Sequence, residues 1–138
     1  MATEVDPFLT QWHRAVTAKD LDALHGLLAE DVSLGPPPYW GRLEGRDLVH
    51  HLLGLIIETI DAFTYHREWQ HGPELALEFT GHVGEVELQG IDLISLDDQS
   101  KVRRLDVLIR PAQAVDALRE IVAPKMQSYF ADRSKGAA

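Results

Sequence analysis

One acidic residue interrupts the most apolar strand-like segment of the chain. Asp92 lies within Gly90-Ile-Asp-Leu-Ile-Ser-Leu96, and its neighbours on both sides are aliphatic. An ionised carboxylate in such a place is strongly disfavoured unless it is paired or protonated. We therefore expect Asp92 either to face a cavity with a raised pKa, where it could act as an acid or base, or to bind a neighbouring strand or arginine for structure alone.

A second carboxyl, Glu78, stands between Leu77 and Phe79 in another apolar strand-like run. Its face depends on the register of the hairpin that follows, and a slip of one residue reverses that face. If Glu78 lies inside with Asp92, one carboxyl pKa rises and the two groups form an acid/base couple. If it lies outside, it faces solvent or a second subunit.

The seven histidines show no H-x-H or H-x-x-x-H spacing, so the sequence predicts no metal site. The chain has no cysteine, no G-x-G-x-x-G and no G-x-S-x-G, so we also predict no cofactor and no triad hydrolysis. His66 is the strongest candidate for a further acid or base. Its strand phase, however, is opposite to that of Phe63, Tyr65 and Trp69.

Large aromatic residues could enclose an apolar ligand. Tyr39 and Trp40 follow three consecutive prolines, which suits either a lid over a cavity mouth or a dimer contact. Tyr65 and Trp69 are expected to line the pocket or to pack beneath a helix. Trp12 is expected to form a pocket wall or part of the core.

Helices must position these residues in the first half of the chain. Apolar residues at helical spacing predict a first helix ending near Lys19, a second capped by Asp20, and a third from about Arg46 to Thr59. Residues 35–45 form a loop, because proline lacks the backbone N–H that regular structure needs. A last helix is expected to stop near Pro124, and residues 131–138 to form a flexible tail.

The second half alternates apolar and polar residues with period two, which predicts strands. The expected strand segments are 63–69, 75–79, 86–88, 90–96 and 102–110. Helices followed by antiparallel strands are typical of an α+β domain in which helices cover one face of a curved sheet.

The composition limits the partners that the protein could have. A chain of 138 residues is one typical domain, here spanning residues 1–138, and its formal charge of −9 opposes binding to nucleic acid or anionic lipid. The longest apolar run, Leu52 to Ile57, is too short to cross a membrane. Met1-Ala-Thr-Glu lacks the features of a signal peptide, so we expect a cytoplasmic protein.

The order of elements resembles the nuclear transport factor 2-like superfamily, in particular its SnoaL-like bacterial branch. The matching segments are Lys19-Asp-Leu-Asp22, Leu28-Ala-Glu-Asp-Val32, Gly45-Arg-Asp47, Gly90-Ile-Asp-Leu-Ile94 and Val102-Arg-Arg-Leu-Asp-Val-Leu-Ile-Arg-Pro111. The resemblance covers roughly residues 6 to 123. It implies a conical half-barrel, in which a curved, mainly antiparallel sheet wraps around three N-terminal helices with a C-terminal helix added, commonly in a homodimer.

The resemblance also suggests roles for single residues. Asp92 stands where ketosteroid isomerases carry an acid that remains protonated and donates a hydrogen bond. Trp12 replaces the tyrosine of those enzymes, however, and Gly35 or Pro36 replaces their base, so the same residues cannot perform the same proton transfer. His66 could correspond to the pocket histidines of scytalone dehydratase.

Limonene epoxide hydrolase, another relative, carries a catalytic aspartate near the position of Asp106. The superfamily pattern places Leu105, Val107 and Ile109 inside, and alternation then sends Asp106 outward to pair with an arginine. The residues that we expect around a ligand, besides Asp92 and His66, are Trp12, Tyr39, Trp40, Tyr65, Glu78, Leu88 and Val107.

The sequence is consistent with two functions. The first is a cofactor-independent acid/base enzyme, of isomerase, dehydratase, cyclase or epoxide hydrolase type, that acts on an apolar, ring-containing molecule. The second is a noncatalytic ligand-binding or dimerisation module. A homodimer is expected in either case, because Ile91, Leu93 and Leu108 would lie together on the outer face of the sheet.

Overall fold

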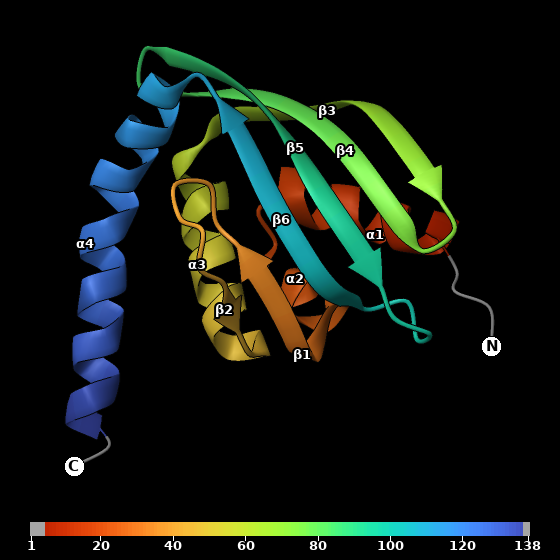
Figure 1. The fold of residues 1–138 in the computed structure, drawn as a ribbon, viewed down its shortest axis with the longest axis horizontal. Helices are drawn as coiled ribbons and strands as arrows, with labels where there is room; N and C mark the ends of the chain where they lie inside the picture. The colour runs from red at the N-terminus through yellow and green to blue at the C-terminus, as the bar shows by residue number, and fades with distance from the viewer. Residues whose placement is uncertain (1–4, 137–138) are drawn as a thin grey trace.

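The sheet and helices follow the predicted order closely. The computed structural model describes residues 5–136, and over this range it contains four helices and six strands (Figure 1). The elements are α1 (Val5–Thr17), α2 (Leu21–Leu27), β1 (Leu28–Gly35), β2 (Leu43–Glu44), α3 (Arg46–Thr59), β3 (Asp61–His71), β4 (Glu74–Val83), β5 (Val86–Leu96), β6 (Val102–Arg110) and α4 (Ala112–Gly136). The side chain of Asp20 caps α2 by accepting a hydrogen bond from the Ala23 N–H, as predicted.

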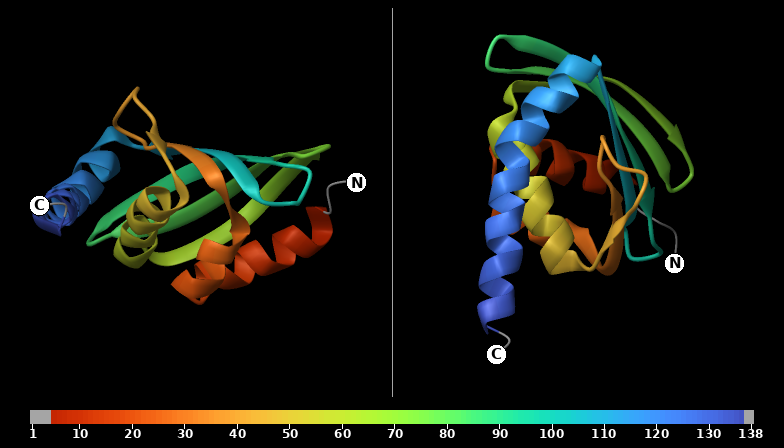
Figure 2. Two further views of the ribbon diagram at one scale, coloured as in Figure 1. Left: turned by 90° about the horizontal axis from the view of Figure 1, so that it is seen from below. Right: turned by 60° about the vertical axis from the view of Figure 1, so that its left-hand side comes forward.

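The six strands form one curved sheet in the order β2-β1-β6-β5-β4-β3. Only the β1–β6 pair is parallel among the strands of residues 5–136, and all other neighbouring pairs are antiparallel. The sheet bends around α1, α2 and α3 without closing on itself (Figure 2). The predicted α+β half-barrel is therefore confirmed.

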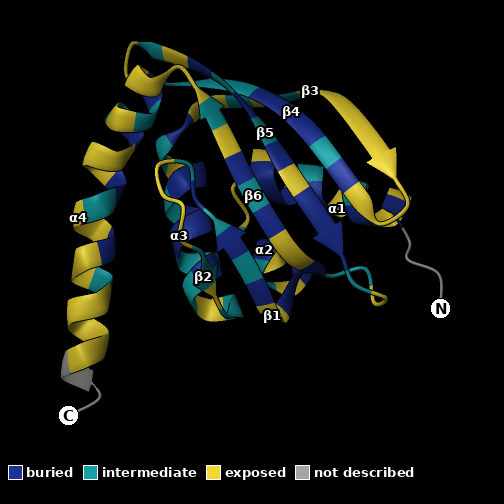
Figure 3. Cartoon of the chain, in the orientation of Figure 1, coloured by how far each residue is buried: buried dark blue, intermediate teal, exposed yellow. Residues whose placement is uncertain are grey.

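Strand alternation separates the two faces of the sheet. Leu77, Asp92 and Val107 lie side by side on neighbouring strands and point to the concave face. The adjacent row, Glu78 and Ile91, points to the convex face. The concave face is buried by the helices, whereas buried residues alternate with more exposed ones along the middle of β5 and β6 (Figure 3).

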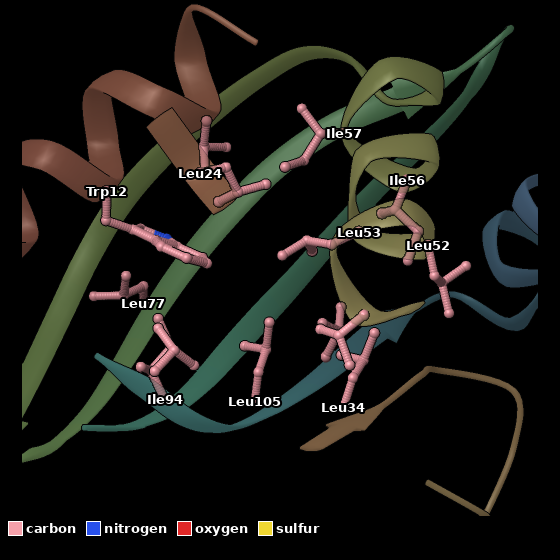
Figure 4. Packing of buried hydrophobic residues seen from close by; sticks show 14 of the residues in the cluster. Trp12, Leu24, Leu34, Leu52, Leu53, Ile56, Ile57, Leu77, Ile94 and Leu105 are labelled. Carbon is pink, nitrogen blue, oxygen red and sulfur yellow. The ribbon is translucent and has the colours of Figure 1, made fainter. Parts of the chain in front are cut away.

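The core lies between the helices and the concave face. Trp12 of α1 and Leu24 of α2 are completely or almost completely buried, and they face Leu77 and Ile94 of the sheet (Figure 4). Burial of these large apolar side chains is the main force that holds the helices in the curve of the sheet.

An irregularity in β3 changes which side chains point inward. Tyr65 pairs with Phe79, but Glu68 pairs with Leu77, so β3 holds one more residue than β4 between these two pairs. The phase of the strand reverses at this bulge. Trp69 is consequently 48% exposed, and the expectation that it lines a pocket or packs beneath a helix is wrong.

The last helix runs past Pro124, so the expectation that it stops there is wrong. A proline removes one helical hydrogen bond, but α4 continues to Gly136. Its second half packs on α3, where the rings of His51 and Tyr129 stack with centroids 4.0 Å apart. Residues 131–136, expected in the tail, belong to this helix, and residues 137–138 lie outside the described residues.

Within the described chain, no helix combines the length and the apolar character that crossing a membrane requires.

Candidate functional site

Asp92 projects from the middle of β5 into the space beneath α1 and α3. Its side chain is buried, with only 5% of the residue exposed, and its strand neighbours across the sheet are Leu77 and Val107. Burial raises the pKa of this carboxyl from 3.8 to about 7, although a hydrogen bond from Tyr65 opposes the shift. The predicted raised pKa and inward orientation therefore agree with the structure.

Two aromatic side chains form a hydrogen-bonded chain that ends at Asp92. The indole N–H of Trp12 donates to the Tyr65 hydroxyl oxygen over 2.9 Å. That hydroxyl donates in turn to Oδ2 of Asp92 over 2.7 Å. Burial and the neighbouring Asp92 raise the pKa of Tyr65 well above its usual value. Tyr65 is thus a neutral hydrogen-bond donor across the physiological pH range.

The sequence indicated Trp12, Tyr65 and Asp92 as candidate site residues, but not the hydrogen bonds between them. Tyr65 and Asp92 come from β3 and β5, which are separated by β4. The available sequence signal for this contact was that strand alternation allowed both side chains to point inward. Among the described residues, Tyr65 is the only group that donates a hydrogen bond to the Asp92 side chain. The second carboxyl oxygen, Oδ1, therefore remains available to a ligand.

A small space adjoins the carboxyl of Asp92. We refer to it as the inner space; its lining residues are Trp12, Val16, Leu53, Ile56, Ile57, Phe63, Tyr65, Phe79, Asp92 and Val107. Its volume is about 10 Å³, which is near the minimum for one water molecule. Val107, which we expect near a ligand, belongs to this lining. Leu88 is buried on the same inward phase of β5 but does not belong to this lining.

Glu78 does not join Asp92. It lies on the convex face, where Arg67 Nη2 and Gln89 Nε2 donate to its Oε2 over 2.7 and 2.8 Å. The Arg67 guanidinium is the main reason why the pKa of Glu78 falls to about 2. The register of β4 with β5 excludes the acid/base couple that the sequence left open.

His66 also lies away from Asp92. It is exposed, and its Nε2 shares a hydrogen bond of 2.7 Å with Thr80 Oγ1 on the neighbouring strand. The imidazole therefore does not reach the inner space, because β3 turns Tyr65 inward and His66 outward. Across residues 5–136, no three His, Cys, Asp or Glu side chains gather in an arrangement that could hold a metal ion.

Asp106 points outward and pairs with arginine, as alternation predicted. Arg104 Nε donates to its Oδ2 over 3.1 Å, and Arg42 Nη1 donates to its Oδ1. Arg42 belongs to the proline-rich loop and also donates to Ser33 Oγ over 2.6 Å. Gly35 lies beneath this pair, and a Cβ there would stand 2.7 Å from Arg42 Nη1. These hydrogen bonds hold the loop against β1 and β6.

A larger hollow lies between this loop, α3 and α4. We call it the outer groove; it has a volume of about 430 Å³ and is lined by Pro36, Pro37, Pro38, Tyr39, Gly41, Arg42, Leu43, Leu52, Ile56, Val115, Leu118, Arg119, Val122, Ala123, Met126, Gln127 and Phe130. Tyr39 thus stands at a hollow, as a lid residue would. Trp40 is fully exposed and does not line the groove.

Comparisons with known proteins agree with this geometry. The model of the SnoaL-like domain family matches residues 9–105. A steroid delta-isomerase from Pseudomonas aeruginosa is similar in structure with a TM-score of 0.86 and 32% identity, covering 94% of this chain and 97% of its own. A bacterial protein of cystatin-like fold from Silicibacter pomeroyi DSS-3 has a TM-score of 0.87 and 33% identity, covering 94% and 93%. No curated protein sequence matches the chain.

Proposed function

The chain belongs to the SnoaL-like domain family, and we propose that it is a cofactor-independent acid/base enzyme of isomerase type, with Asp92 as its catalytic group. One observation carries the proposal: a buried carboxyl, with a pKa raised to about 7, keeps one oxygen free beside an apolar space. Both protonation states are populated near neutral pH, which suits a group that must accept and return a proton.

The proposed reaction is the migration of a double bond in a β,γ-unsaturated cyclic ketone. Ionised Asp92 removes a proton from the carbon between the carbonyl and the double bond, and the electron pair shifts onto the carbonyl oxygen as a dienolate forms. The protonated carboxyl then returns the proton to the γ carbon. Substrate and product are isomers, so the reaction needs no second reactant.

Tyr65 and Trp12 assist by holding the carboxyl. The Tyr65 hydroxyl stabilises the ionised form of Asp92 through its 2.7 Å hydrogen bond and orients the free oxygen. Trp12 fixes the hydroxyl because its N–H is directed at the same oxygen atom. Asp92 must both remove and return the proton, because the other two groups are absent. In the resemblance to ketosteroid isomerases, Trp12 stands in place of their tyrosine, and Gly35 or Pro36 in place of their base.

An enzyme assay tests this role directly. The probes are 5-androstene-3,17-dione and the smaller 3-cyclohexenone, and the conjugated enone formed is followed by its ultraviolet absorbance. We expect kcat/KM of the wild type to rise with pH and level off above about pH 7, because ionised Asp92 is the base.

The Asp92→Asn variant should lose about 100-fold or more in rate, which is the usual contribution of a general base. Near-ultraviolet circular dichroism should show that it keeps the native packing. A wild type that converts neither ketone, or a variant as active as the wild type, would overturn the proposal.

One observation favours the noncatalytic alternative. The inner space has a volume of about 10 Å³, so a ring cannot reach Asp92 unless neighbouring side chains move. A module that only binds an apolar molecule would use the outer groove instead. Tight binding of both ketones with no turnover at any pH would support this alternative.

A further inference from the structure

The outer groove and the inner space share one side chain. Ile56 of α3 lines both hollows, whereas Leu52 lines only the groove and Ile57 only the inner space. Helical geometry explains this. Ile56 lies one turn after Leu52, on the face of α3 towards the outer groove, and next to Ile57, on the face towards the inner space. Leu53 and Ile57 point to the Trp12 side of α3, while Leu52 lies on the other side (Figure 4).

We infer that the two hollows are halves of one ligand site, which the Ile56 side chain divides. The occupant is an elongated, uncharged, apolar molecule with a carbonyl group near its leading end. Its body lies in the outer groove, and its leading end passes Ile56 so that the carbon beside the carbonyl group reaches Asp92. This inference rests on the proposed function, because Asp92 is the group that receives that end.

The volume and the walls of the groove define this class of ligand. A volume of about 430 Å³ lies within the usual range for small-molecule pockets. Its walls are mostly aliphatic and aromatic, from proline and tyrosine of the loop and from the apolar faces of two helices. An apolar body is therefore favoured in the groove.

The charged groups of the groove oppose a charged ligand. Arg42 is held by Asp106 and Ser33, and Arg119 Nη2 lies 3.3 Å from Asp116 Oδ1. The lining of the described groove thus offers no arginine without a carboxylate partner. The formal charge of −9 further disfavours an anionic molecule.

Dye binding to a variant whose outer groove is filled by a tryptophan side chain tests whether the ligand binds in that groove. The uncharged dye N-phenyl-1-naphthylamine, which fluoresces more strongly in apolar surroundings, is titrated into wild type and two variants. Ala123→Trp places a large ring in the groove, and Ile121→Trp places the same ring on the same helix at an exposed position outside the lining.

We expect wild type and Ile121→Trp to bind the dye equally, and Ala123→Trp to bind it about tenfold more weakly or worse. Equal affinity in all three proteins would overturn the inference, as would a wild type that does not bind the dye.

The role of Ile56 as the partition between the two hollows is tested with Trp12 as the probe, because Trp12 lines only the inner space. In a Trp40→Phe/Trp69→Phe background, Trp12 is the only tryptophan, and its indole N–H gives one resonance in a ¹H–¹⁵N spectrum. Cyclohexyl phenyl ketone is added to this protein and to its Ile56→Ala and Leu52→Ala variants, which shorten one side chain each on the same helix.

We expect saturating ketone to shift the Trp12 resonance more in Ile56→Ala than in Leu52→Ala. If the alanine variant does not fold, Ile56→Val removes a single methylene-sized group and should act in the same direction. Equal shifts in the Ile56 and Leu52 variants would overturn the partition.

The two proposals fail in different ways. A wild type that binds the ketone with the expected dependence on Ile56, but converts no enone, supports this inference and overturns the proposed function. An active enzyme whose Trp12 resonance responds equally in both variants overturns this inference and leaves the function of Asp92 standing.

Discussion

Two carboxyls on neighbouring strands show how one step along a strand changes the chemistry of a residue. Asp92 pairs across the sheet with Leu77, and Glu78 pairs with Ile91 in the next row. Asp92 therefore points into the apolar core, where burial raises its pKa to about 7. Glu78 points outward to Arg67, which lowers its pKa to about 2. Only the inward carboxyl can exchange a proton near neutral pH.

Replacement of Asp92 by asparagine should change how stability depends on pH. Between about pH 4 and 7 the folded protein holds a proton on Asp92 that the unfolded chain has released, so stability falls as pH rises through this window. The neutral amide removes that penalty. Urea unfolding near pH 8 should find Asp92→Asn more stable than wild type by up to about 4 kcal/mol, and near pH 4 about equal.

Glu78→Gln provides the matched control, with the opposite sign. The lowered pKa of Glu78 means that its charge stabilises the folded state above about pH 4.5 and that this contribution disappears as pH falls towards 2. Glu78→Gln should therefore be less stable than wild type near pH 8. His51, whose pKa burial lowers, titrates in all three proteins and cancels from the differences. A difference between Asp92→Asn and wild type that does not change with pH would contradict the assignment.

The hydroxyl of Tyr65 should control the pKa of Asp92. Tyr65→Phe removes the donor to the carboxylate, so the pKa of Asp92 should rise above about 7. The same change leaves the Trp12 N–H buried without its acceptor, at a cost of about 1–3 kcal/mol in the free energy of unfolding. A ¹³C NMR titration of the Asp92 carboxyl measures the first effect, and urea unfolding the second.

Trp12→Phe serves as the control, because it keeps the hydrogen bond between Tyr65 and Asp92 and should move the pKa of Asp92 less. An unchanged or lowered pKa in Tyr65→Phe would show that the hydroxyl does not stabilise the ionised carboxyl.

At the scale of elements, the inner wall of the site depends on close packing between β4 and β5. Gly90 of β5 pairs with Phe79 of β4, and the Phe79 ring covers the place where a Cβ would stand. The same ring stacks on Phe63, with centroids 4.5 Å apart. Because position 90 has no side chain, the Phe79 ring can lie over β5 beside Asp92 while it stacks on Phe63 of β3.

Gly90→Ala should therefore destabilise the protein. The added methyl group would meet the Phe79 ring and lie 2.6 Å from the Leu108 carbonyl oxygen, and such overpacking costs about 1–3 kcal/mol or more. Gly26→Ala in α2 is the matched control, because nothing lies within 4 Å of its Cβ position. That change should stabilise the protein by about 0.5–1 kcal/mol, since alanine favours a helix. Urea unfolding that gave both variants the same sign would contradict this packing.

At the scale of the whole molecule, the convex face of the sheet carries an apolar surface. Leu93 and Leu108 are 43% and 52% exposed, and Trp69 joins them because of the bulge in β3. Cross-strand pairing connects Ile91 with Leu108 and Ala76 with Leu93. Exposed apolar surface of this kind is typical of an interface, and we propose that a second copy of the chain covers it.

Light scattering should therefore find a homodimer of about twice the 15.5 kDa chain mass at micromolar concentration. Leu108→Glu should convert it to a monomer, because association would then bury a carboxylate in an apolar contact. Ile121→Glu, at an exposed position on α4, should leave the dimer intact. A wild type that stays monomeric at all concentrations would contradict the interface.

Asp106 lies on the same face of the sheet but is not suitable for testing the dimer. Its carboxylate is already engaged by Arg42 and Arg104 of the same chain. Charge reversal at this position would first release the proline-rich loop from the sheet, so a change in association could not be assigned to the interface.

Local pattern by itself determined most of the elements and indicated an apolar environment for Asp92. The spacing of apolar residues predicted α3 from about Arg46 to Thr59, and these are its observed ends. For β6, the superfamily pattern together with alternation predicted that Asp106 points outward. These predictions succeed because side-chain direction along a regular element follows its own periodicity. The aliphatic neighbours of Asp92 in the sequence favoured a buried carboxyl with a raised pKa, but they left a purely structural pairing open.

Only the tertiary structure decided how separate elements meet. The register of β4 placed Glu78 outside, and one extra residue in β3 turned Trp69 outward, because inter-strand hydrogen bonds and not local pattern set both. Packing on α3 carries α4 past Pro124, although proline disfavours a helix interior. The contact between Tyr65 and Asp92, and the position of Ile56 between two hollows, arise from segments brought together across the sheet, which no local periodicity encodes.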